Sequence, residues 1–88
     1  MHDVTLSPAQ CRAARGLLNW DINGLAAATG LTRKTISDFE NGKAEPRPRT
    51  VRDILKAFDD AGVTFIGAGE DSPSGGPGVR LNHIPDSP

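Results

Sequence analysis

The chain has 88 residues, enough for one small domain, and no apolar run approaches the roughly 20 residues that span a bilayer. Its N-terminus has no basic segment followed by an apolar one, so we expect no signal peptide and a cytoplasmic protein without membrane contact. One cysteine cannot form an internal disulfide, and one thiol with two histidines gives no zinc framework. We therefore expect no metal and no cofactor.

The charge is unevenly distributed along the chain. The formal net charge is −1, which is not the footprint of a strong nucleic-acid binder. Residues 1–50, however, carry seven Lys/Arg against five Asp/Glu, whereas residues 51–88 carry three against six. The first part is therefore basic by two charges and the second acidic by three. This asymmetry fits either an anion-binding N-terminal part or ordinary solvated surface.

The first two helices are predicted from the residues that begin and end them. Ser7 and Gln10 form a capping box around a proline, which predicts a helix from residue 8 to near Asn19. A second, short helix is expected over about 22–29. Gly30 ends it, because glycine can take the left-handed conformation that a sharp turn requires.

The third helix is expected to begin after Thr32, a residue that favours the N-cap position. Ile36 and Phe39 lie three residues apart and give this helix one apolar face. The pair 41–42, Asn-Gly, is expected to end it. The opposite face is polar.

A stiff loop with two prolines is expected over 43–49, before the fourth helix. Thr50 and Asp53 have the spacing of another capping box, which predicts a helix over about 51–61. Apolar residues at helical spacing give it the clearest amphipathic pattern in the chain: Val51, Ile54, Leu55 and Phe58.

Beyond the helices the pattern changes. Residues 63–66 are β-branched or aromatic and predict a strand, and residues 79–81 predict a second short strand. The Gly/Ser/Pro-rich segment 67–78 between them is expected to be a mobile loop. The expected organisation is a helical domain over 6–62, strands with a flexible loop over 63–81, and a flexible tail over 82–88.

The second and third helices have the spacing of a DNA-binding helix-turn-helix. When Ile22 is counted as the first position, Ala26 falls fifth, Gly30 ninth, Ile36 fifteenth and Phe39 eighteenth. A small residue in the fifth place lets the two helices cross closely, and glycine in the ninth permits the turn. The two apolar residues anchor the third helix, which leaves its other face free for a major groove.

The sequence resembles the Cro-like, phage-repressor-type helix-turn-helix family, also called the xenobiotic-response-element family, over residues 6–62. The resemblance rests on Arg15, Trp20, Leu25-Ala26, Thr29-Gly30-Leu31-Thr32, Thr35-Ile36-Ser37, Phe39-Glu40-Asn41-Gly42-Lys43 and Pro46. It implies a mainly α, four-helix repressor-like domain with a short C-terminal strand or hairpin. It also implies sequence-specific binding of double-stranded DNA by a transcriptional regulator, more plausibly a repressor than an activator.

The resemblance places the start of the third helix in the major groove. The implied base-reading residues are Arg33, Lys34, Ser37 and Asp38. Arg33 or Lys34 would donate to guanine and Asp38 would accept from a cytosine amine. Two alternatives stay open: the two cations are ordinary exposed charges, and Asp38 pairs with Lys34 four residues earlier.

Phosphate contacts are implied for a second set of residues around the third helix and the following loop. These are Thr32, Thr35, Asn41, Lys43, Arg47 and Arg49. Such contacts position a protein on DNA without reading sequence. The alternative for the three cations is solvated loop charge.

The resemblance also implies a structural ion pair between Arg15 and Glu40.

Two positions depart from the family pattern. Ile22 stands where a phosphate-contacting glutamine is usual, and Gly24 where an acidic residue is common. Both departures put a phosphate contact by the second helix in doubt.

A small reader of this type usually binds DNA as a homodimer. We expect the fourth helix and the strands to form the interface, with four alternating apolar residues taking part: Val63, Phe65, Val79 and Leu81. The two strands can pair within one chain or across two chains. The alternative is a hairpin packed on the helices of its own chain.

Two other functions are weighed against DNA binding. The first is a protein-interaction or antitoxin-like module with weak DNA affinity and an unidentified protein partner. It is suggested by the net charge of −1 and by Ile22 and Asp38. Catalysis is not expected, because Cys11 lies on the buried face of the first helix, and the two histidines lie near the ends of the chain.

Overall fold

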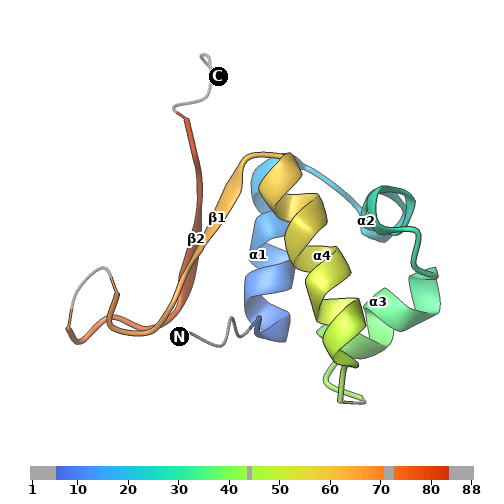
Figure 1. The fold of residues 1–88 in the computed structure, drawn as a ribbon, viewed down its shortest axis with the longest axis horizontal. Helices are drawn as coiled ribbons and strands as arrows, with labels where there is room; N and C mark the ends of the chain where they lie inside the picture. The colour runs from blue at the N-terminus through green and yellow to red at the C-terminus, as the bar shows by residue number, and fades with distance from the viewer. Residues whose placement is uncertain (1–5, 44, 71–72, 84–88) are drawn as a thin grey trace.

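The computed structural model describes residues 6–43, 45–70 and 73–83 (Figure 1). Four helices precede a two-stranded antiparallel hairpin in this part of the chain: α1 Pro8–Leu18, α2 Ile22–Thr29, α3 Arg33–Glu40, α4 Pro48–Asp60, β1 Val63–Ile66 and β2 Gly78–Leu81. The predicted mainly helical domain with a C-terminal hairpin is confirmed. Of the segments expected to be mobile, residues 71–72 and 84–88 lie outside the described residues.

The capping box predicted for α1 is present. The Ser7 hydroxyl accepts a hydrogen bond from the Gln10 backbone N–H, and the Gln10 side-chain oxygen accepts one from the Ser7 N–H, both at 3.0 Å. Two of the backbone donors at the start of the helix are thereby satisfied. At the other end, Asn19 adopts the left-handed conformation with φ of 57°. The predicted bounds of α1 are confirmed.

The turn between α2 and α3 also has the predicted form. Gly30 has φ of 77°, in the region where a Cβ is disfavoured. Two residues later the Thr32 hydroxyl accepts a hydrogen bond from the Thr35 backbone N–H at 3.1 Å, which caps α3. The close succession of these two features turns the chain sharply between two eight-residue helices.

The predicted start of α4 is wrong. The helix begins at Pro48, three residues before the predicted Val51, and Arg47 is its N-cap residue without a side-chain capping bond. Proline is well suited to the first helical position, because its φ is already helical and it has no N–H to leave unpaired. Thr50 and Asp53 therefore lie inside the helix and form no capping box, and Arg49 belongs to the first turn instead of a loop.

The core lies where the predicted helical faces meet. In Figure 1, α2 and α3 lie on one side of α1 and α4, and the hairpin lies on the other side. α3 contacts α1 and α2, α4 contacts α2 and β1, and α1 contacts β2. Trp20 stacks on Phe58 with ring centroids 5.8 Å apart, and Phe65 meets Phe58 edge-on at 5.7 Å. The largest fully buried side chains are Phe58, Leu25, Ile36, Ile54, Val63 and Cys11. Each element from α1 to β1 therefore contributes to one core.

The hairpin is paired within one chain, with Val63 opposite Leu81 and Phe65 opposite Val79. One side chain of α1 also hydrogen-bonds to both strands. The Gln10 amide nitrogen donates to the carbonyl oxygen of Ile66 at 3.3 Å and to that of Gly78 at 3.0 Å. The same glutamine thus caps α1 and binds both strands.

Intrachain pairing also settles which way the apolar strand residues face. The sequence predicts Val63, Phe65, Val79 and Leu81 at a dimer interface, but Val63 is only 1% exposed and the other three pack half-buried against the core of their own chain. Alternate residues of a strand share one face, and this face is already covered by helices. Val63 is therefore buried within its own chain, while the other three side chains stay partly exposed.

Candidate nucleic-acid interface

α3 has one buried face and one accessible face. Ile36, Phe39 and Glu40 are buried, whereas Arg33 and Lys34 at its start are exposed. The remaining polar residues of the helix are half-buried: Thr35, Ser37 and Asp38. The spacing of the apolar residues therefore orients the helix so that its cationic start faces away from the core.

The C-terminal end of α3 is held by a polar network. Arg15 of α1 donates from Nε to Glu40 Oε2 at 2.8 Å and from Nη2 to Glu40 Oε1 at 2.7 Å. The Cys11 thiol donates to Glu40 Oε2 at 3.1 Å, and Arg12 donates to the Glu40 carbonyl oxygen at 2.6 Å. Because Glu40 is almost fully buried, its carboxylate requires these donors. The network joins α1 to α3 and includes the ion pair implied by the resemblance.

The charges in this network stabilise each other. Burial by itself raises the pKa of Glu40, but hydrogen bonds from Arg15 and Cys11 and the charges of Arg15 and Arg12 outweigh it and lower that pKa. The hydrogen bond to Glu40 raises the pKa of Arg15. Burial, followed by the hydrogen bond to Glu40, raises the pKa of the Cys11 thiol, which remains a protonated donor at neutral pH. Glu40 is therefore a structural anion that lies away from solvent.

Two members of this network were not predicted from the sequence. Arg12 and Cys11 both bind Glu40, whereas only Arg15 was expected to do so. The available signal was the helical spacing, since Arg12 precedes Arg15 by three residues and so lies on a neighbouring part of the α1 surface.

The start of α3 combines hydroxyl groups with cations. The Thr32 and Thr35 hydroxyl oxygens are 2.9 Å apart, so the two hydroxyl groups form a hydrogen bond with each other at the start of the helix. The first turn contains no acidic residue. Arg33 forms no ion pair with any residue that the structure describes. Cations at a helix N-terminus oppose the helix dipole, so this end is favourable for an anion from outside the chain.

Lys34 and Asp38 form an ion pair at 2.7 Å, one helical turn apart. The Lys34 side chain is 83% exposed and that of Asp38 28%. The hydrogen bond from Lys34 lowers the pKa of Asp38. Nearby, the Asn41 amide donates to the Ser37 hydroxyl at 3.3 Å. The pairing alternative for Asp38 is therefore realised in the free chain, and its negative charge is compensated locally.

The cations after α3 lie on both sides of a bend in the chain. Lys43 is exposed before it, and Arg49 is exposed in the first turn of α4. Arg47 occupies the N-cap position of α4 without a side-chain capping bond. A hollow of about 420 Å³ separates this segment from α3, lined by Thr35 and Asp38 on one side and by Arg47 on the other. The structure thus brings the start of α4 close to α3.

A family model described as helix-turn-helix matches residues 12–60. This match covers more than half of the chain. The chain belongs to the Cro-like, phage-repressor-type helix-turn-helix family. It is a DNA-binding regulator, and the family is one of regulators and not of enzymes. Comparison with curated proteins finds no match.

This helix-turn-helix regulator departs from its family at the start of α2. Ile22 is half-buried and packs against the core, so the position that usually carries a polar phosphate contact takes part in packing instead. Gly24 directs its backbone N–H to the Asp21 carboxylate at 2.7 Å, which caps the helix. α2 itself carries no cation, and the exposed cations of this region lie on α3 and on the segment that follows it.

No described helix is both long and apolar enough to cross a membrane. Among the described residues, no group of three or more His, Cys, Asp or Glu side chains is placed to hold a metal ion.

Proposed function

We propose that this protein is a transcriptional repressor that binds double-stranded DNA as a homodimer and reads the major groove with α3. The observation that carries the proposal is the two-sided structure of α3. Its buried face is fixed by Ile36, Phe39 and the Glu40 network, while Arg33 and Lys34 are exposed at its start. A helix held rigidly from one side can present the other to base edges.

Arg33 is the base-reading residue that the geometry favours. It has no ion-pair partner within the described residues, whereas Lys34 already binds Asp38. A guanidinium donates two parallel hydrogen bonds to guanine O6 and N7, the commonest specific contact in protein–DNA complexes. Ser37 and Asp38, one turn further along α3, are the other proposed readers, with Asp38 accepting from a cytosine amine once Lys34 turns to a phosphate.

The backbone of the DNA is proposed to lie against the start of α4 and the segment before it. Arg47 supplies no side-chain cap, so backbone N–H groups at this helix end are available to an external acceptor. Arg49 in the first turn and Lys43 before the bend add positive charge. A phosphate placed here would satisfy the free donors and interact favourably with the helix dipole. Thr32, Thr35 and Asn41 are proposed to donate to further phosphates.

Homodimer formation and repression follow from the small size of this surface. One copy offers few cations, so a single chain would bind DNA weakly and with little discrimination. Two copies related by a two-fold axis would bind two half-sites and add their contacts. A protein that occupies promoter DNA excludes others from it, which favours repression over activation.

The test is selection of binding sites from random duplex DNA with purified full-length protein at moderate salt. The expected result is a palindrome with half-site centres about 10 bp apart. The double variant Arg33→Ala/Lys34→Ala should select no site, while Arg80→Ala, which removes an exposed hairpin cation, should select the same site as the parent. A reporter placed under the selected operator should be silenced by the parent and not by the double variant.

A different outcome would favour the protein-interaction alternative. If no sequence is enriched and the double variant retains the same weak, salt-sensitive binding as the parent, α3 does not read the groove. The half-buried Ile22 in place of a phosphate-binding side chain is the observation that favours this alternative. The chain would then act as an antitoxin-like module whose partner is a protein.

A further inference from the structure

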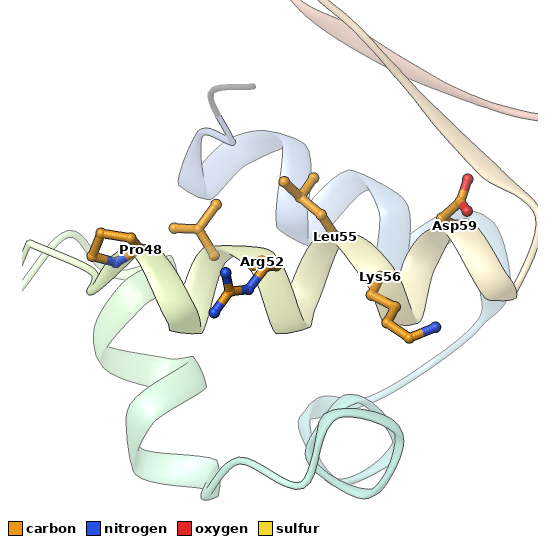
Figure 2. Close-up of a pocket in the computed structure, with 6 residues that line it drawn as sticks. Pro48, Arg52, Leu55, Lys56 and Asp59 are labelled. Atoms are coloured by element: carbon orange, nitrogen blue, oxygen red, sulfur yellow. The ribbon is translucent and has the colours of Figure 1, made fainter. Parts of the chain in front are cut away.

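The outer side of α4 carries a shallow groove of about 550 Å³, which meets the proposed DNA surface only at the start of the helix. Figure 2 shows Pro48 near one end of this side of the helix and Asp59 near the other, with Arg52, Leu55 and Lys56 between them. The lining residues, which include Val51, recur at intervals of three and four positions and so form one stripe along the helix. Val51 and Leu55 contribute apolar surface at its centre.

Two unpaired charges of opposite sign lie along this groove. Arg52 and Asp59 are both exposed, and neither forms an ion pair with another described residue. They are seven positions apart, which separates them by about 10 Å along the helix axis. Lys56 lies between them but is paired with Asp60 at 3.2 Å. The groove therefore has an unpaired cation one helical turn in from Pro48, an unpaired anion near its other end, and the apolar side chain of Leu55 between these two charges.

We propose that a second copy of this chain binds in the groove, with the two α4 helices antiparallel about a two-fold axis beside Leu55. This inference rests on the proposed homodimer and names its interface. A two-fold axis at this point places Arg52 of one copy opposite the partner's Asp59, and Asp59 opposite the partner's Arg52. The Leu55 side chains of the two copies meet at the axis. A two-fold interface brings the same surface of both copies together, so that surface must be complementary to itself. This stripe meets the condition, because its cation and its anion each lie opposite the other in the partner.

Two features of the structure favour a second copy over an unrelated protein. The inner face of the hairpin, the other apolar surface expected to mediate dimerisation, is already covered by the helices of its own chain. Lys56, the cation nearest the axis, is neutralised by Asp60, so two copies do not bring two unpaired cations together. One helix pair buries less than the roughly 1,200 Å² of a standard interface, so the free dimer is expected to be weak, with adjacent half-sites adding to its stability.

Charge reversal tests this arrangement without DNA. Sedimentation of the full chain at tens of micromolar should show a dimer whose dissociation constant rises by about tenfold or more in Arg52→Glu and in Asp59→Arg, because each variant opposes like charges at both ends. An equimolar mixture of the two variants should form a heterodimer, since every opposed pair is again of opposite sign. The double variant Arg52→Glu/Asp59→Arg should regain homodimerisation.

Arg80→Glu, a charge reversal on the hairpin, is the matched control and should leave the dissociation constant unchanged. Circular dichroism and thermal unfolding establish that each variant is folded. A monomeric parent, or a dimer insensitive to both reversals, overturns the interface, as does a mixture that forms no heterodimer. These outcomes are separate from DNA binding: a monomer that still selects an operator leaves the DNA function standing, and a heterodimer without a selected operator supports the interface alone.

Discussion

The guanidinium of Arg15 and the carboxylate of Glu40 join α1 to the last residue of α3 through two hydrogen bonds of 2.8 and 2.7 Å. Such bidentate pairs fix orientation as well as distance. The same carboxylate binds the Cys11 thiol, so α3 is fixed at the end that is remote from its exposed cations. The position of the exposed cations that we propose to face DNA therefore depends on an ion pair at the opposite end of α3.

Breaking this pair should destabilise the domain. Arg15→Met leaves the buried Glu40 carboxylate without its main partner, and we expect the free energy of unfolding to fall by about 2–3 kcal/mol, less than for a fully buried pair because Arg15 is 19% exposed. Urea unfolding measures this loss. Lys56→Met, which breaks an exposed pair on α4, should change it by less than ~0.5 kcal/mol. Equal losses in the two variants would contradict the structural role of Arg15.

The same carboxylate should make stability depend on pH. Because the pKa of Glu40 is lower in the folded chain than its ordinary value of 4.5, the unfolded chain binds the proton more tightly. This contribution is complete at neutral pH and is lost as the pH falls below about 4.5 toward the folded value. Urea midpoints from pH 6 to pH 3 should fall more steeply for the parent than for Glu40→Gln. Parallel pH profiles would contradict the assignment.

What the sequence predicted well is what local chemistry determines. The ends of α1, α2 and α3 follow from side chains that bond to backbone groups within three residues, as Ser7 and Thr32 do. The start of α4 was missed because Arg47 forms no such bond, and a plausible capping pair, Thr50 and Asp53, lay a few residues later. In α3 the apolar spacing identified the accessible face, but the choice between pairing and base reading for Asp38 depends on where one flexible lysine points.

Gln10 shows why the packing of the hairpin against α1 could not be predicted from the sequence. Its amide bonds to Ile66 and Gly78, which are 56 and 68 positions away, and no local pattern specifies such contacts. The reciprocal α1 cap was predicted from the same residue, because Ser7 is only three positions away. When one side chain has a local role and a long-range role, the sequence predicts only the local role.

The two roles of Gln10 can be separated by substitution. Gln10→Glu keeps an oxygen for the Ser7 N–H but removes the donor to both strands and opposes a carboxylate to two carbonyl oxygens. We expect a loss of about 1–3 kcal/mol in the free energy of unfolding and faster amide hydrogen exchange in β1 and β2. Ser7→Ala removes only the cap, at about 1 kcal/mol, and should leave exchange in the hairpin slow relative to the helices.

Arg33 and Lys43 should differ in how they affect DNA binding. Arg33→Ala should weaken binding to a selected operator by about 1–3 kcal/mol and relax the preference at one base pair, since it removes a base contact. Lys43→Ala should weaken binding to all sequences alike and reduce the slope of log K against log salt by about 1. Affinities measured at several salt concentrations, for operator and scrambled duplexes, distinguish them. If Arg33→Ala affects both duplexes equally, Arg33 contacts phosphate and not bases.

Two glycines should respond to alanine in opposite directions, because their backbone conformations differ. Gly16 lies inside α1, and a Cβ there would meet nothing within 4 Å, so Gly16→Ala should raise the free energy of unfolding by up to ~1 kcal/mol. A Cβ at Gly30 would also meet nothing within 4 Å, but its φ of 77° is left-handed. Gly30→Ala should therefore lower stability by about 1–2 kcal/mol through backbone strain alone. A neutral result at Gly30 in urea unfolding would mean that the turn has another conformation.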